Sequence, residues 1–265
     1  MFKLIAQEYV SQYSFLNLFN FITFRVGASI LTSLFFSLIF GQYIIKKLSN
    51  IQPYGQPIRN DGPENHIVKK AGTPTMGGVL IILSIFFSSV LWADLQNNFV
   101  WIGLLALILF GFIGIIDDFK KIKSNSSNGL KAITRIILQI VFSLIISLVI
   151  LKMLDDQIDT TISFPFFKNL IINFGYFYLL ISLFILVGSA NAVNLTDGLD
   201  GLAIVPVMIV AMTFSFIAYV SGNIVFSEYL LINYIPGAGE LSVLRSGDEF
   251  PCPLYLQQSV ADFKR

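Results

Sequence analysis

Two adjacent carboxylates follow an uncharged apolar stretch, and their type and spacing suit phosphate or metal chemistry. Asp117 and Asp118 come directly after residues 99–116, and Lys120 and Lys121 follow them. Adjacent side chains point in different directions on a helix, so one carboxylate could hold a hard cation while the other accepts a proton or a hydrogen bond. Mg²⁺ suits such a pair because it prefers oxygen ligands and keeps water or phosphate oxygens as its other ligands. A solvated cluster of charges at the end of a helix is the alternative interpretation.

A second acidic cluster, residues 191–201, lies between two uncharged apolar stretches. It contains Asn194, Asp197 and Asp200 but no cation to pair with the carboxylates, which therefore need water or a bound ligand. The two carboxylates would share one face if the segment were helical, whereas two nearby glycines permit a tighter loop. A water-exposed turn is the alternative interpretation, and the alternating oxygen ligands of an EF-hand loop are absent.

A third polar segment, residues 59–78, combines cations, hydroxyls and glycines ahead of an apolar stretch. Lys70 and Thr75 offer a cation and a hydroxyl to an anionic ligand at the start of a helix. Gly77 and Gly78 would allow the backbone to approach such a ligand closely. The spacing of a P-loop is absent. The alternative interpretation is a capped helix start with a glycine face that packs against another helix.

Together, the three clusters indicate phosphate chemistry assisted by Mg²⁺, which would neutralise developing charge and position a phosphate for attack. A histidine-rich zinc site is excluded because the chain has one histidine. No Ser-His-Asp arrangement is evident. The net charge of +1 provides no basic surface for nucleic acid, and the single Cys252 leaves no disulfide within the chain.

Membrane-spanning helices are expected to position these clusters. The 265-residue chain is 55% apolar and 12% charged, about half the charge of an ordinary globular protein, and its mean hydropathy is +0.76. A membrane core of about 30 Å requires roughly 20 helical residues. We therefore predict an all-α, polytopic transmembrane bundle in a single domain, residues 1–243, followed by an atypical tail, residues 244–265. The expected spans are residues 26–45, 77–93, 99–116, 136–151, 170–190 and 202–220.

The distribution of positive charge predicts the orientation, because cytoplasmic loops carry an excess of Lys and Arg. Most cations of the chain lie in two loops, residues 46–75 and 117–135. The amino terminus is therefore predicted to lie outside, with residues 1–24 at the membrane interface. The loops that hold Asp117 and residues 191–201 are predicted to lie inside. All three polar clusters then share the cytoplasmic face.

At these clusters the chain closely resembles the phospho-N-acetylmuramoyl-pentapeptide transferases, within the wider family of polyprenyl-phosphate sugar-1-phosphate transferases. The resemblance rests on residues 59–78, Asp117, Asp118, Lys121, and residues 191–201 and 235–241. It runs from about residue 20 to Leu241 with the order and spacing of the motifs preserved.

The resemblance implies transfer of phospho-MurNAc-pentapeptide from UDP-MurNAc-pentapeptide to undecaprenyl phosphate, which gives lipid I and UMP in peptidoglycan synthesis. It also implies Mg²⁺ as the cofactor, a multi-pass location in the bacterial inner membrane, and membrane lipids and a second copy of the chain as candidate partners. Asp117 and Asp118 would be the catalytic residues and the metal ligands. The substrate-binding residues would be Lys70 and Thr75 near the phosphates, Asn194 and Asp197 on the nucleotide side, and Lys121 and Asp200 nearer the sugar.

The chain departs from the family pattern in its carboxy-terminal part. The family has about ten spans, a further Asp-x-Gly-Ser metal site and a His-rich loop, whereas about six spans and neither motif are expected here. Residues 244–265 change character abruptly, so we expect a fragment made by a frameshift or premature stop that is inactive as given. A short natural variant is the alternative.

A second functional hypothesis is an ion-coupled membrane transporter, because carboxylates near span ends also mark ion pathways. Its weakness is that no ionisable residue lies inside any expected span.

Overall fold

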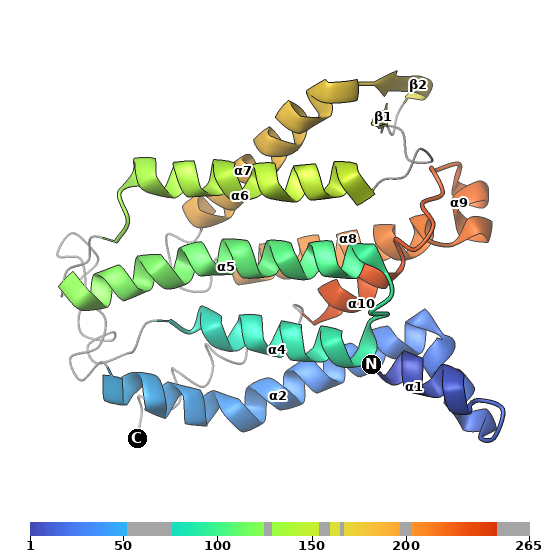
Figure 1. The fold of residues 1–265 in the computed structure, drawn as a ribbon, viewed down its shortest axis with the longest axis horizontal. Helices are drawn as coiled ribbons and strands as arrows, with labels where there is room; N and C mark the ends of the chain where they lie inside the picture. The colour runs from blue at the N-terminus through green and yellow to red at the C-terminus, as the bar shows by residue number, and fades with distance from the viewer. Residues whose placement is uncertain (52–75, 125–128, 154–159, 165–166, 197–202, 248–265) are drawn as a thin grey trace.

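The computed structural model describes residues 1–51, 76–124, 129–153, 160–164, 167–196 and 203–247. In these ranges the chain forms a helical bundle with one antiparallel hairpin (Figure 1). In chain order the elements are α1 (Phe2–Tyr9), η1 (Ser14–Asn20), α2 (Ile22–Ile51), α4 (Gly78–Trp92), α5 (Asn98–Ser124), α6 (Ala132–Met153), β1 (Thr161–Phe164), β2 (Phe167–Asn173), η2 (Gly175–Phe177), α7 (Tyr178–Thr196), α8 (Ile204–Ser221), α9 (Ile224–Leu230) and α10 (Glu240–Ser246).

Five helical segments are long and apolar enough to cross a membrane: α2, α5, α6, η2 with α7, and α8. The shorter apolar helix α4 packs between α2 and α5. A helix satisfies its own backbone N–H and C=O groups, which is the requirement for crossing lipid. All six expected spans therefore overlap apolar helices, and the prediction of an all-α polytopic bundle is confirmed.

One expected span, residues 170–190, begins too early. Its first residues belong to strand β2, which pairs antiparallel with β1 from Thr161 opposite Asn173 to Phe164 opposite Phe167. The helical part starts only at Gly175, where η2 leads into α7. Hydropathy alone does not separate a short apolar strand from the first turns of an apolar helix, so the boundary was misplaced.

Helices α2 and α4 pack through small polar side chains. Ser29, Ser33 and Ser37 are buried at an i, i+4 spacing on α2, and Ser84 and Ser88 are buried on α4. The hydroxyl oxygens of Ser29 and Ser88 lie 2.6 Å apart. Small residues allow two helix backbones to approach closely where lipid provides no hydrophobic driving force between them.

Helix α10 completes the core at one end of the bundle. Val243 and Leu244 of α10 are buried against Ala93, Val100 and Leu104, which lie on or beside α4 and α5. The helix continues to Ser246, so packed structure runs past residue 243, where the domain was expected to end. Residues 248–265 of the expected tail lie outside the described residues.

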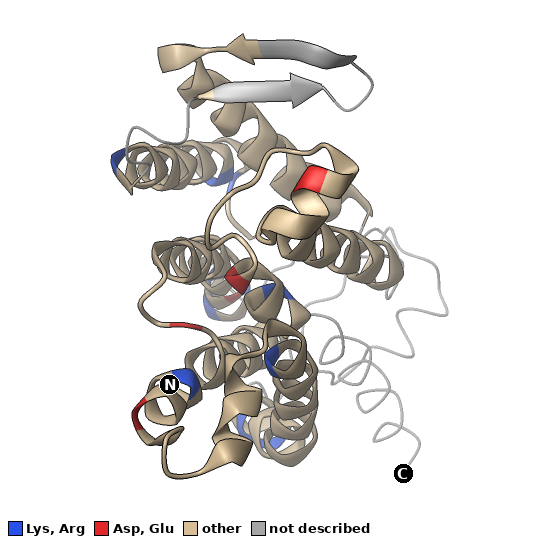
Figure 2. Ribbon diagram, turned by 90° about the vertical axis from the view of Figure 1, so that its right-hand side faces the viewer, with Lys and Arg blue, Asp and Glu red and all other residues tan. Residues whose placement is uncertain are grey.

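A buried ion pair ties α10 to α2 at this end. Both guanidinium Nη atoms of Arg25 donate to the Glu240 carboxylate at 2.6 Å, and both side chains are almost fully buried. The backbone N–H of Asp94 donates to Glu240 as well, and Lys3 Nζ lies 2.5 Å from Asp94. We call this the Arg25 end; Figure 2 looks onto it and shows few charged residues among the helices.

The opposite end of the bundle carries the acidic pair. The carboxy terminus of α5, the start of α4 and the start of α6 lie together there (left in Figure 1), and α7 also ends on that side. We call this the Asp117 end. The long helices therefore run between two chemically different ends, one closed by a buried ion pair and the other rich in polar groups.

Candidate active site

The acidic pair lies where α5 extends beyond its apolar part. With 27 residues, α5 is about 40 Å long, which exceeds a membrane core of about 30 Å. Its uncharged part ends at Ile116, and Asp117 and Asp118 begin the final turns. Lys121 and Lys123 follow near the carboxy terminus of the helix, where cations interact favourably with the helix dipole.

Lys121 joins the two carboxylates. Its ammonium nitrogen lies 2.5 Å from Asp117 Oδ2 and 3.3 Å from Asp118 Oδ1. The i, i+4 and i, i+3 spacings bring the three side chains onto neighbouring positions of one helix surface. The side chains of Asp117, Asp118 and Lys121 are 19%, 29% and 31% exposed, so the group is partly shielded but open to a ligand from solution.

Backbone amides from two other segments hold the carboxylates. The N–H of Leu130, in the turn before α6, donates to Asp117 Oδ1 with an N to O distance of 2.6 Å. The N–H of Met76, just before α4, donates to Asp118 Oδ2 at 3.2 Å. Met76 has φ 73°, a left-handed conformation that is uncommon for a residue other than glycine.

The glycines of this region differ in their surroundings. A Cβ added at Gly78 meets nothing within 4 Å, so the expected alternative of a glycine face packed against another helix does not apply there. A Cβ added at Gly129 would lie 2.3 Å from Asp117 Oδ1. Close backbone approach to the acidic pair therefore occurs at Gly129, which the sequence motifs did not single out.

Asn194 is the substrate-binding candidate of the second acidic cluster that lies within the described residues. It is on the last turn of α7 and contacts α6. Its Oδ1 accepts from Nη1 of Arg135 at 3.4 Å. One turn earlier, Asn191 donates to Gln139 of α6 at 2.8 Å. These contacts align α7 with α6, and no hydrogen bond among the described residues joins Asn194 to the acidic pair.

Of the eight expected site residues, the structure brings Asp117, Asp118 and Lys121 together. Lys70, Thr75, Asp197 and Asp200 lie outside the described residues. The expectation for these four therefore stays a prediction.

Sequence reasoning missed the residues that support the acidic pair. Met76 and Leu130 act through backbone amides, which carry no side-chain signature. Gly129 had a weak local signal, a glycine after the polar run 124–128. Only the folded arrangement shows that these segments meet α5.

The acidic pair fits a hard divalent cation by its donor chemistry. Mg²⁺ is commonly held by one or two carboxylates together with phosphate oxygens of a substrate. Asp117 and Asp118 supply such carboxylates on one helical turn. The ammonium group of Lys121 lies beside them and could contact a bound phosphate. Among the described residues there is no group of three or more His, Cys, Asp or Glu side chains placed to hold a metal without a substrate.

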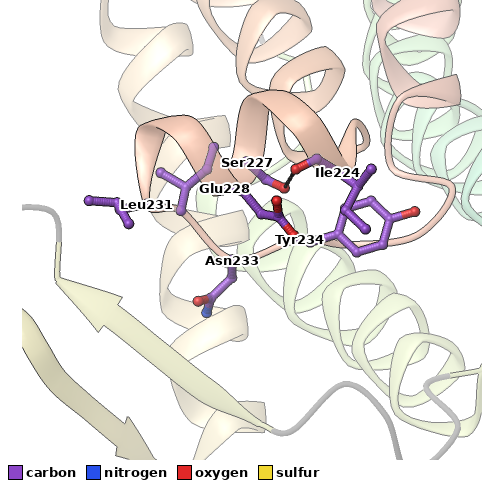
Figure 3. Close-up of a pocket in the computed structure, with 7 residues that line it drawn as sticks. Ile224, Ser227, Glu228, Leu231, Asn233 and Tyr234 are labelled. Carbon is purple, nitrogen blue, oxygen red and sulfur yellow. Dashed lines mark hydrogen bonds between the residues drawn. The ribbon is translucent and has the colours of Figure 1, made fainter.

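A pocket at the other end of the molecule has a different character. It is formed by α9 and the segment after it (Figure 3). Its lining residues are Ile224, Ser227, Glu228, Leu231, Ile232, Asn233 and Tyr234. Helix α9 lies at the Arg25 end of the bundle, whereas the acidic pair is at the opposite end (Figure 1). With one carboxylate and no cation, this pocket does not provide the groups that phosphate chemistry requires.

Two family models match the chain in the region of the acidic pair. A model of glycosyl transferase family 4 matches residues 100–239, which include most of α5 and all of α6, α7 and α8. Residues 70–82, which include Met76, match phospho-N-acetylmuramoyl-pentapeptide-transferase signature 1. The two matches therefore contain both segments that meet at Asp118.

Curated relatives are similar over most of the chain. A phospho-N-acetylmuramoyl-pentapeptide-transferase of Pelagibacter ubique (strain HTCC1062) is 52% identical over 243 residues, which cover 92% of this chain and 67% of that protein. The protein of the same name from Rickettsia prowazekii (strain Madrid E) is 50% identical over 231 residues, which cover 87% of this chain and 63% of that protein. The chain thus spans about two thirds of the length of these relatives.

Proposed function

Since this chain belongs to glycosyl transferase family 4, among the phospho-N-acetylmuramoyl-pentapeptide transferases, we propose that it transfers phospho-MurNAc-pentapeptide from UDP-MurNAc-pentapeptide to undecaprenyl phosphate. The products would be lipid I and UMP, an early step of peptidoglycan synthesis. The observation that supports the proposal is the acidic pair itself. Two carboxylates, each held by a backbone amide and both contacted by Lys121, lie where a long apolar helix ends.

The reaction requires groups that bind phosphate and accept a proton. An oxygen of the lipid phosphate must bond to the phosphorus that carries the sugar, while the bond from that phosphorus to UMP breaks. We assign Asp117 as the base or activator of the lipid phosphate, because it is the more shielded carboxylate and is oriented by Leu130. Asp118 would support the phosphate region, and Lys121 would contact the developing negative charge.

Mg²⁺ would be held by Asp117 and Asp118 together with substrate phosphate oxygens. The ion would neutralise negative charge on the phosphates that react. The protein's own contribution is then to orient the two carboxylates and to keep Lys121 within reach of both. Asn194, Lys70, Thr75, Asp197 and Asp200 complete the proposed substrate site.

The chain is a multi-pass membrane protein, and we place its Asp117 end on the cytoplasmic face of the bacterial inner membrane. The excess of Lys and Arg in the loops of residues 46–75 and 117–135 supports this orientation. It also suits the substrates, because a soluble nucleotide sugar and a lipid phosphate can meet only at a membrane surface.

A transfer assay in detergent tests the proposal. The purified 265-residue chain is incubated with labelled UDP-MurNAc-pentapeptide, undecaprenyl phosphate and Mg²⁺, and labelled lipid and released UMP are quantified. Equal amounts of both products, as given by the Pelagibacter ubique relative run in parallel, support the proposal. Absence of product from this chain alone would instead support the expectation of an inactive fragment. Ion flux in vesicles without product would support the transporter.

A further inference from the structure

We infer that Gly129 is a positioning residue for Asp117: its lack of a side chain lets the turn before α6 close onto the Asp117 carboxylate. This inference rests on the proposed function, in which Asp117 activates the lipid phosphate. Gly129 belongs to none of the sequence motifs, and it acts through Asp117 without need of substrate contact.

The space around Gly129 is too small for a side chain. A Cβ at Gly129 would lie 2.3 Å from Asp117 Oδ1, and 2.7 Å from both Cγ and Oδ2. These distances are shorter than any van der Waals contact, so one group must move. The three nearest atoms all belong to the end of a single short side chain. Alanine at this position would therefore displace the Asp117 carboxylate while leaving the helices in place.

A hydrogen bond and an ion pair hold the Asp117 carboxylate in place. Asp117 Oδ1 accepts from the Leu130 N–H at 2.6 Å, and Oδ2 is paired with Lys121. The carboxylate is thus fixed at both oxygens, one by the turn and one by its own helix. A rotation forced by a Cβ at Gly129 breaks the Leu130 bond first, because that donor adjoins the new methyl group. The base then loses its orientation toward an attacking phosphate, although its charge remains.

Such a displacement affects the chemical step more than substrate binding. Misplacing a catalytic group by about 1 Å can cost on the order of 10²-fold in rate. We therefore expect Gly129→Ala to lower kcat about 10²-fold, with KM for the nucleotide sugar nearly unchanged. A structural defect of the bundle would instead lower the thermal stability.

Gly114→Ala is the matched control. Gly114 lies on α5 close to Asp117, and a Cβ added there meets nothing within 4 Å. We expect Gly114→Ala to retain kcat within about threefold, since it leaves the positioning contact in place.

Hydrogen exchange of the Leu130 amide tests the contact without any turnover. In the 265-residue chain in detergent, Asp117→Ala and Gly129→Ala should both speed exchange of this amide about tenfold or more, because a bond to a charged acceptor is lost. Gly114→Ala should leave the exchange unchanged. All three variants should unfold at temperatures close to that of the parent chain.

The two measurements separate the inference from the proposed function. If the parent chain transfers nothing, the proposed function fails for this chain, yet the exchange experiment still decides whether Gly129 holds the carboxylate contact. Equal exchange in the parent, Asp117→Ala and Gly129→Ala chains would overturn the inference. So would a Gly129→Ala chain that keeps the parent kcat, or one that loses activity only together with its thermal stability.

Discussion

Within the part of the chain that the structure describes, Lys121 contacts both carboxylates of the acidic pair, and its contribution can be separated from that of its neighbour Lys120. Replacing it with methionine keeps the length of the side chain but leaves Asp117 and Asp118 to repel each other. We expect Lys121→Met to lower the transfer rate about tenfold or more, because the orientation of the pair and a contact to phosphate are lost together. Initial rates of lipid I formation at saturating substrates measure the effect.

Lys120→Met provides the control for charge alone, because Lys120 is exposed on the same turn of α5. It should retain at least about half of the rate, because an exposed substitution usually changes stability by no more than about 0.5 kcal/mol and leaves the contacts of Lys121 in place. Equal losses for the two variants would mean that the net positive charge of this end matters and that the contacts of Lys121 do not.

At the scale of residues, sequence reasoning found the acidic pair because its chemistry resides in side chains. Adjacent carboxylates at the end of an apolar run are visible without a fold. The support of the pair was not visible, because Met76 and Leu130 donate through backbone amides, and Leu130 is thirteen positions from Asp117 in the chain. Contacts of this kind depend on how loops return to a helix, which no local pattern encodes.

Among the elements, the apolar helices could be predicted and the short polar or paired elements could not. Runs such as residues 99–116 are uncharged and long enough to cross a membrane, which favours a helix that satisfies its own backbone. The β1–β2 hairpin depends on pairing between two segments, and hydropathy does not report pairing. Helix α10 is held by the ion pair of Glu240 and by the burial of Val243 and Leu244, and both depend on distant segments, so its packing also escaped prediction.

The Arg25 and Glu240 pair should be a principal support of the Arg25 end. Arg25→Met would leave Glu240 buried without its main partner, and loss of one member of a buried pair costs about 3–5 kcal/mol. We expect a loss of that size in the free energy of unfolding, measured by denaturant titration in mixed micelles. Lys47→Met, an exposed change on the same helix, should stay within about 0.5 kcal/mol of the parent chain.

The double variant Arg25→Met with Glu240→Met provides the decisive comparison. Replacing both members by apolar groups is often neutral, so it should recover most of the stability. A double variant as unstable as the sum of the single variants would show that the two side chains act independently, contrary to the ion pair described.

Asp94 makes this end sensitive to acid. Partial burial acts to raise the pKa of its carboxyl, but the hydrogen bond and charge of Lys3 and the Gln96 amide outweigh it, so the pKa is lowered overall. Arg25 also favours the charged form, while Glu240 and the amino group of Met1 lie nearby. Because the folded state holds the carboxylate at a lower pKa than the unfolded state, the stabilisation is complete above the unfolded pKa and is lost as pH falls through the folded value.

The expected result is a melting temperature that falls when pH is lowered below about 4, the ordinary range of an aspartate. Asp94→Asn should lower the melting temperature at neutral pH and show a smaller further loss in acid. If the melting temperatures of the parent chain and of Asp94→Asn fell by equal amounts between neutral pH and a pH of about 3, Asp94 would not be the source of the acid sensitivity.

For the whole molecule, the proposed reaction requires that the two ends of the bundle face opposite sides of the membrane. Cysteine labelling in right-side-out spheroplasts tests this in a Cys252→Ser background. Gln96→Cys, in the exposed turn between α4 and α5, should react with a membrane-impermeant maleimide. Ser124→Cys, at the exposed end of α5, should react only after the membrane is permeabilised. The reverse pattern would place the acidic pair outside.

Asp117→Asn is the sharpest test of whether the acidic pair at the end of α5 performs phosphate transfer. The amide has nearly the same shape as the carboxylate, but it neither accepts a proton nor neutralises a cation. Loss of a general base typically costs about 10²-fold or more, so we predict a fall of at least that size in the rate of UMP release and lipid I formation, with expression unchanged. Retention of more than about a tenth of the parent rate by Asp117→Asn would contradict the account.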